Sequence, residues 1–119
     1  MQDALLIVLC DSPFQYESAD QVYEIAQAAL RKSYKVNIFI MMDGVYNLIT
    51  SQSGEPLNMS TISEKLADLM DKGVKITACR VCMELRGVDE KMFPKGLDVG
   101  GIFDLSDMIA NSDVVINFI

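Results

Sequence analysis

Two cysteines separated by two residues are the strongest chemical signal in this chain. Cys79 and Cys82 lie in residues 74–88, which read VKITACRVCMELRGV. A short β-type run precedes Cys79 and a helix-compatible segment follows it, so we expect Cys79 at a junction between a strand and a helix. The free N–H groups and the positive dipole end of a helix stabilise a thiolate, the reactive form of cysteine. The pattern therefore predicts thiol chemistry centred on Cys79.

Two cations follow this cysteine. Arg80 is adjacent, and Arg86 is seven residues further on, about two helical turns along nearly the same face. We expect both arginines to lower the pKa of the Cys79 thiol. Cys82 is three residues after Cys79 and so lies on the same side of the predicted helix, where one thiol is placed to attack a sulfur atom held by the other.

Cys10 and Cys82 also have structural interpretations. Free cysteine is among the most buried residue types, and Cys10 ends an apolar run, so its more typical role is in the core and it is only a supporting candidate for the site. Cys82 is either a buried small hydrophobe or a second thiol. The Cys-x-x-Cys spacing also occurs in zinc sites, which need four ligands. Because the chain has no His and only one more, distant Cys, we expect no metal site.

The rest of the chain alternates patterns typical of strands and helices. Apolar runs predict strands at residues 4–10, 35–42, 74–78 and 114–119, the last of them buried, and a very short strand at 97–99. Helical spacing predicts a helix from Ser18, with a capping box to Gln21, and a second from Ser60 or Thr61 to Gly73, with a capping box from Thr61 to Glu64. Shorter helices are expected at residues 45–49 and 106–111, and loops at 50–58 and 89–96.

This alternation predicts βαβ units. We expect one α/β domain over residues 1–119, with three α/β/α layers and a mostly parallel sheet of about five strands. Parallel strands end on a common edge, where open α/β folds bind ligands. That rule groups Cys10, Asp43, Tyr46 and Cys79 on one edge. Asp43 is either a solvated turn residue or a fixed carboxylate facing the edge, and Tyr46 is more typical of packing.

Composition restricts the partners and the chemistry. The net charge of −7, with ten Lys or Arg residues, argues against direct nucleic-acid binding, which needs clustered cations. No apolar run approaches the ~20 residues of a membrane span, and the opening segment lacks the features of a signal peptide, so we expect a cytoplasmic protein with reduced thiols. Hydrolases that depend on His are excluded, and the two common glycine-rich phosphate motifs are missing, so we expect no cofactor.

Four segments, taken in order, match a known pattern. They are the apolar run at residues 4–10, Asp43-Gly44-Val45-Tyr46-Asn47 after the second strand, the cysteine ending the third strand with Leu85-Arg86-Gly87-Val88 after it, and the closing apolar strand. In these features the chain resembles the DsrE/DsrF-like sulfur-relay family over nearly its whole length. The resemblance implies a cysteine, matching Cys79, that carries sulfane sulfur as a persulfide, with sulfur donor and acceptor proteins as partners. It also implies trimers or hexamers, built from identical or related subunits.

Three functions follow from these observations. The first is a sulfur carrier or sulfurtransferase that accepts sulfane sulfur on Cys79 and passes it to a partner thiol. The second is a thiol–disulfide oxidoreductase that uses Cys79 and Cys82. The third is a non-catalytic subunit of a sulfur-relay complex, with its cysteines in the core. A cysteine at the position of Cys82 occurs in only part of the family, so it is either half of a redox pair or a thiol that resolves the persulfide.

Overall fold

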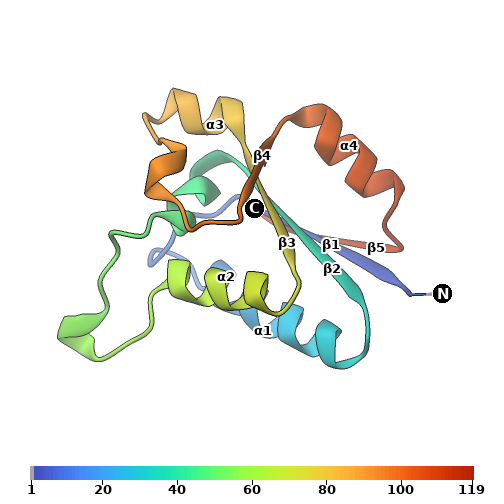
Figure 1. Ribbon diagram of the computed structural model, residues 1–119, viewed down its shortest axis with the longest axis horizontal. Coiled ribbons are helices and arrows are strands. Elements are labelled where there is room, and N and C mark those ends of the chain that lie inside the picture. Colours follow the sequence, from blue (N-terminus) through green and yellow to red (C-terminus); the bar gives the residue numbers. More distant parts are fainter. Residues whose placement is uncertain (1) are drawn as a thin grey trace.

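A computed structural model describes residues 2–119. Within this range five strands form one sheet in the order β4-β3-β2-β1-β5, and every neighbouring pair is parallel (Figure 1). The strands are β1 Ala4–Leu9, β2 Lys35–Ile40, β3 Lys75–Cys79, β4 Asp98–Gly100 and β5 Val114–Phe118. The expected α/β fold with about five strands is confirmed, and the sheet is entirely parallel.

Helices cover both faces of the sheet. The α-helices are α1 Ser18–Arg31, α2 Ile62–Asp71, α3 Arg80–Leu85 and α4 Ile102–Ala110, and the 3-10 helices are η1 Met42–Leu48, η2 Glu55–Leu57 and η3 Glu90–Met92. Figure 1 shows α1 and α2 below the sheet and α4 above it, which gives the expected three layers. No helix in residues 2–119 has the length and apolar character needed to cross a membrane.

The alternation of side chains along β1 divides the core in two. Leu5, Ile7 and Leu9 belong to the main core, which also contains the inward faces of α1 and α2. Leu6 and Val8 point to the opposite face. They belong to a second cluster, which consists of Leu6, Val8, Phe39 and Leu105 and includes the inward side of α4. Because β1 is buried on both faces, its sequence is continuously apolar.

The two predicted capping boxes have different outcomes. At α2 the prediction is confirmed, because the Thr61 hydroxyl accepts from the Glu64 N–H at 3.2 Å and the Glu64 carboxylate accepts from the Thr61 N–H at 3.4 Å. At α1 it is wrong, because the N-cap residue is Glu17. The Ser18 hydroxyl instead donates to the Asp11 carboxylate, which ties the start of α1 to the loop after β1.

Two predictions near the C-terminus also need correction. The last helix begins at Ile102 rather than at residue 106, because the Asp104 carboxylate accepts from the Gly101 N–H at 2.8 Å and holds the first turn. The last strand is not buried. β5 pairs only with β1, at the edge of the sheet, and leaves Val114 44% and Val115 37% exposed.

Candidate functional site

The carboxyl ends of β1, β2 and β3 bring the three cysteines into one region. Cys10 directly follows β1, and Cys79 is the last residue of β3. Leu9 pairs with Ile40 of β2, and Ile40 pairs with Ala78 of β3, so the ends of these strands are level. Cys82 follows in α3. Asp43 and Tyr46 belong to η1, which begins two residues after β2.

Cys79 is both the end of β3 and the N-cap residue of α3, as expected, and its side chain is partly exposed. Burial is the main influence on its thiol and raises the pKa. The nearby Cys82 thiol raises this pKa further, while the backbone N–H groups of Cys82 and Val81 lower it. The net pKa lies above the ordinary value, so at neutral pH the free chain holds Cys79 mainly as the thiol.

The expected effect of the two arginines on Cys79 is therefore wrong. Arg80 extends to solvent, where its guanidinium lies 3.1 Å from the Glu90 carboxylate. Arg86 contacts the Asp43 carboxylate at 2.8 Å and the Cys82 carbonyl oxygen at 3.1 Å. The assumption of two helical turns fails because α3 ends at Leu85, which makes Arg86 its C-cap residue.

Cys82 combines the two roles considered for it. Its side chain is 6% exposed and belongs to the main core, as a small hydrophobe would. Its thiol nevertheless lies near enough to raise the pKa of Cys79, because residues three apart on a helix share one face. Cys82 is therefore a buried thiol close to the more accessible one.

Cys10 lies in the same neighbourhood. It is partly buried and packs against the second cluster, as Cys79 does. Burial raises the pKa of the Cys10 thiol most, and the Asp11 carboxylate and the Cys82 thiol raise it further. The influence of Cys82 on Cys10 places all three thiols within electrostatic reach of one another.

Asp43 and Tyr46 support the site, and neither side chain is hydrogen-bonded to Cys79. The Asp43 carboxylate pairs with Arg86 and so joins η1 to α3, which favours the fixed carboxylate over a free turn residue. Tyr46 is half-buried against the main core, in line with a packing role. Met42, between β2 and Asp43, has a φ of 54°, an uncommon left-handed conformation for a residue other than glycine.

Two supporting residues had no role of their own in the sequence analysis. Asn47 is completely buried, and its side-chain amide donates to the carbonyl oxygens of Asp11 and Gly44, each at 2.8 Å. Gly44 passes so close to β1 that a Cβ atom there would lie 2.3 Å from the Leu9 carbonyl oxygen. The only sequence signal for either was their place in the segment Asp43-Gly44-Val45-Tyr46-Asn47.

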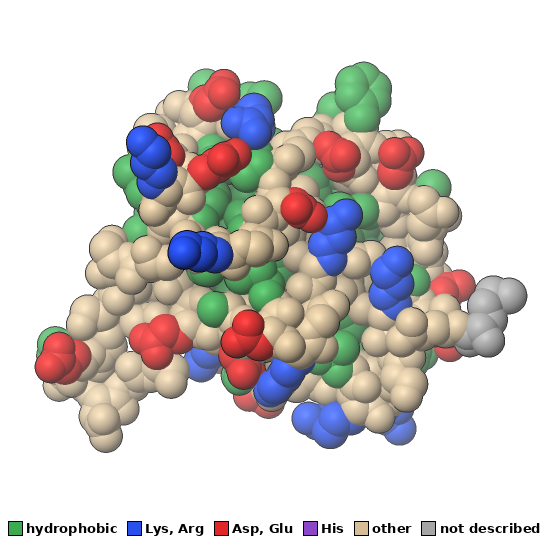
Figure 2. All heavy atoms as spheres, viewed as in Figure 1, with side chains coloured by type: hydrophobic (Ala, Val, Ile, Leu, Met, Phe, Trp, Pro, Cys, Tyr) green, Lys and Arg blue, Asp and Glu red, His purple; other side chains and the backbone are tan. Residues whose placement is uncertain are grey.

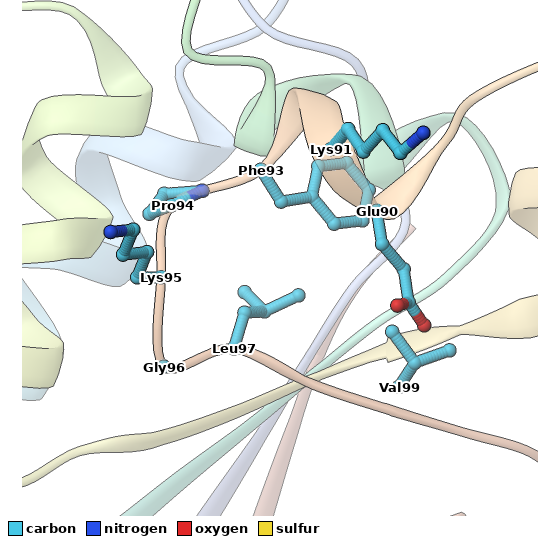
Figure 3. A pocket seen from close by; sticks show the side chains of 8 residues that line it. All are labelled: Glu90, Lys91, Phe93, Pro94, Lys95, Gly96, Leu97 and Val99. Carbon is cyan, nitrogen blue, oxygen red and sulfur yellow. The ribbon is translucent and has the colours of Figure 1, made fainter.

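A cavity of about 420 Å³ lies between η3 and β4. Figure 3 shows Phe93 and Leu97 pointing into it, while the ammonium group of Lys95 points away. Val99 lines this cavity and pairs with Ala78, on the side of the main core. The cavity therefore lies beside the thiol site, and none of its lining residues is a cysteine.

Acidic and cysteine side chains are the available metal ligands in a chain without His. Within residues 2–119 no three of them are arranged to hold a metal ion. The chemistry that the described residues offer is that of the thiols themselves.

A comparison with known protein families identifies the family of this chain. A model of the DsrE/DsrF-like family matches residues 3–118. The chain belongs to this family. In this chain Cys79 ends β3 and lies at the junction between β3 and α3.

Two relatives match over nearly their full length. An uncharacterized protein of Methanopyrus kandleri is 28% identical over 116 residues, which cover 98% of this chain and 94% of the relative. An uncharacterized protein of Methanocaldococcus jannaschii is 26% identical over 112 residues, covering 94% and 96%.

Solved structures support the fold. The crystal structure of the ychN protein from E. coli superposes with a TM-score of 0.86 at 22% identity, covering 99% of this chain and all of that one. A protein of unknown function from Methanobacterium thermoautotrophicum superposes with a TM-score of 0.75 at 15% identity, with the same coverage. At these identities the likeness concerns the fold alone.

Proposed function

We propose that this DsrE/DsrF-like protein is a sulfur carrier, which accepts sulfane sulfur on Cys79 and passes it to a thiol of a partner protein. The observation that carries the proposal is the position of Cys79. It is a partly exposed thiol at the carboxyl edge of a parallel sheet, at the start of a helix, with a second thiol nearby. Open α/β sheets bind their ligands at this edge.

The transfer requires only thiol chemistry. The Cys79 thiol releases its proton, and its Sγ forms a bond to the outer sulfur of a donor persulfide. The bond between that sulfur and the donor breaks, and the donor leaves as a thiolate. The N–H groups of Val81 and Cys82 favour the negative charge on Cys79 before the attack and again when the sulfur departs to an acceptor.

Mass spectrometry tests this proposal with site resolution. Trypsin cleaves after Lys75, Arg80 and Arg86, so Cys79 and Cys82 fall on separate peptides, 76–80 and 81–86. After incubation with glutathione persulfide, we expect peptide 76–80 to gain the mass of one sulfur atom. The Cys79→Ser variant should accept none at that position and lose sulfur transfer to a protein acceptor. Undiminished transfer by this variant would overturn the proposal.

The proximity of the Cys79 and Cys82 thiols favours a second candidate, a thiol–disulfide oxidoreductase. In this case the two residues form a disulfide with a defined reduction potential, and turnover requires both. The Cys82→Ser variant separates the two candidates. A sulfur carrier keeps its persulfide loading without Cys82, whereas an oxidoreductase loses all turnover. If neither thiol reacts with iodoacetamide in the folded chain, a non-catalytic subunit is the better description.

We further propose that the chain assembles with identical copies or related subunits, as trimers or hexamers. Large apolar side chains are exposed on α4 and after β5, including Ile102 at 67%, Phe103 at 84% and Ile119 at 90%. Figure 2 shows apolar side chains projecting from the end of the molecule that α4 forms. Large apolar side chains exposed to this extent are typical of interfaces.

Light scattering tests the assembly. A Phe103→Ser variant should have a lower mass than the wild type. Leu57→Ser is the matched control, because Leu57 is 76% exposed but belongs to η2, away from α4. A monomeric wild-type chain would contradict the proposal.

A further inference from the structure

Cys10 and Cys79 occupy equivalent positions two strands apart. The pairings of Leu9 with Ile40 and of Ile40 with Ala78 make Cys10, Met41 and Cys79 the next residues in one row across the sheet. The backbone continues the ladder at this level, since the Met41 N–H donates to the Leu9 carbonyl at 3.0 Å and the Cys10 N–H donates to the Phe118 carbonyl at 2.8 Å. Figure 1 shows β1, β2 and β3 side by side.

The three side chains of this row lie on the same face of the sheet. Side chains alternate along a strand, so Cys10 shares the face of Leu6 and Val8, and Met41 shares that of Phe39. All three row residues pack against the second cluster, to which these apolar residues belong. The two thiols therefore flank the Met41 side chain on one face, and both are partly exposed.

The distance between Cys10 and Cys79 prevents a disulfide between them but permits the transfer of a sulfur atom. Two strand spacings put the Cα atoms of Cys10 and Cys79 roughly 9.5 Å apart. A disulfide needs a Cα separation below about 7 Å, so these two residues cannot form one without moving the backbone. A persulfide on Cys79 carries its outer sulfur about 2 Å beyond Sγ, which extends the reach of this residue towards Cys10.

We propose that Cys10 is a second carrier position, which receives the outer sulfur from the Cys79 persulfide within the same chain. This inference rests on the proposed function of Cys79. The Cys10 thiol gives up its proton, and its Sγ forms a bond to the outer sulfur. The bond between that sulfur and Cys79 Sγ breaks, and Cys79 leaves with the electron pair and takes up a proton. One persulfide and one thiol exchange roles, with no net oxidation or reduction.

The distance between Cys10 and Cys79 also protects the carried sulfur atom from release as hydrosulfide. Attack by Cys10 on the inner sulfur of the persulfide would release hydrosulfide and leave a Cys10–Cys79 disulfide. The separation of the two Cα atoms prevents that product, so the outer sulfur is the one within reach. Cys82, three residues further along α3 and on the same face, has no such restriction. Cys10 can therefore accept the outer sulfur atom, whereas Cys82 can form a disulfide with Cys79 and release that sulfur as hydrosulfide.

A time course of loading tests the transfer. The Cys82→Ser chain, which lacks the competing thiol, is incubated briefly with glutathione persulfide and freed of donor, and the persulfides are then blocked and mapped on peptides 1–31 and 76–80. We expect sulfur on Cys79 first and on Cys10 later, as Cys79 declines. Adding Cys79→Ser should reduce Cys10 loading at least tenfold, and adding Cys10→Ala should leave Cys79 loaded for longer. Circular dichroism verifies that each variant is folded.

Four outcomes would overturn the inference. If Cys79 accepts sulfur and Cys10 never does, Cys10 is not a carrier, but the proposed function of Cys79 stands. If Cys79 itself accepts no sulfur, both the proposed function and the inference about Cys10 fail. Equal Cys10 loading without Cys79 means that the donor reaches Cys10 directly. If loaded Cys10→Ala protein passes sulfur to Cys79→Ser protein as fast as the Cys82→Ser chain does internally, the transfer is between molecules. Oxidation of the Cys82→Ser chain should also yield no Cys10–Cys79 disulfide.

Discussion

The Arg86 guanidinium lies 2.8 Å from the Asp43 carboxylate and also donates to the Cys82 carbonyl oxygen at 3.1 Å. These contacts join η1, which follows β2, to the C-terminal end of α3. The side chain of Arg86 is 21% exposed, whereas that of Asp43 is 59% exposed. Arg86 thus holds in place the helix that carries Cys82, rather than acting on the Cys79 thiol.

Removing Arg86 should loosen this connection. Because the ion pair is partly exposed, we expect Arg86→Ala to lower the free energy of unfolding by about 1 kcal/mol, and Asp43→Asn by about 0.5 kcal/mol. Urea denaturation of both variants and of the double variant measures the coupling. Arg86→Lys is the control that retains charge but not the paired contacts. Perfect additivity of the two single changes would show that the pair contributes nothing.

Removing the Cys82 thiol should make Cys79 more reactive. The Cys82 thiol raises the pKa of Cys79, so Cys82→Ala should lower that pKa and increase the thiolate fraction at neutral pH. We expect iodoacetamide to alkylate Cys79 at least twofold faster at pH 7, with the midpoint of the pH–rate curve moved to lower pH. Quantification of peptide 76–80 after timed quenching gives both values.

The serine variant refines this test. Cys82→Ser retains a hydroxyl that can hydrogen-bond to Cys79 but does not ionise in this pH range. An intermediate rate is expected if the hydrogen bond and the charge of Cys82 both act on Cys79. A slower reaction in both variants would show that Cys82 activates Cys79 instead.

Gly44 should not tolerate a larger residue. An added Cβ would lie 2.3 Å from the Leu9 carbonyl oxygen and 3.2 Å from an Ile40 side-chain carbon, so η1 would have to move away from β1 and β2. We expect Gly44→Ala to cost about 2–4 kcal/mol in the free energy of unfolding, measured by urea denaturation. Gly101→Ala is the matched control, because nothing lies within 4 Å of its Cβ position, and its cost should stay below about 1 kcal/mol. Equal costs at the two positions would contradict the close approach.

Asn47 should stabilise the loop that follows Cys10. Asn47→Ala leaves the Asp11 and Gly44 carbonyl oxygens without the amide donor, and we expect a loss of about 2–3 kcal/mol. Asn47→Asp keeps the shape but replaces that donor with a carboxylate facing two carbonyl oxygens, so it should be at least as harmful. Faster alkylation of Cys10 in both variants would show that this loop shields the thiol. An unchanged unfolding midpoint would exclude the role given to Asn47.

The sequence by itself determined the features that depend on neighbouring residues. Continuous apolar runs predicted the buried strands, because strands of a parallel sheet are covered on both faces. The Thr61–Glu64 capping box predicted the start of α2, because its contacts span only three residues. The change of pattern at Cys79 likewise predicted its position between β3 and α3.

The charged partners could not be predicted in this way. Arg80 and Arg86 are near Cys79 in sequence, but their guanidinium groups pair with Glu90 and Asp43, residues brought close by the loop after α3 and by η1. Long, flexible cationic side chains extend towards the nearest carboxylate that the fold supplies. The exposure of β5 could not be predicted either, because an apolar strand has the same sequence pattern at the edge of a sheet as in its centre. β5 is exposed here because only β1 pairs with it.

The strand-to-helix junction at Cys79 is thus a local property of residues 74–88. The neighbours of that junction depend on strand order. Only the tertiary structure places β2 between β1 and β3, which sets Cys10 in one row with Cys79 at a distance of two strands. Two successive pairings, of Leu9 with Ile40 and of Ile40 with Ala78, connect the ends of these strands. Their backbone hydrogen bonds leave no mark on local sequence pattern, and for this reason the relation between these two thiols emerges only when the chain is folded.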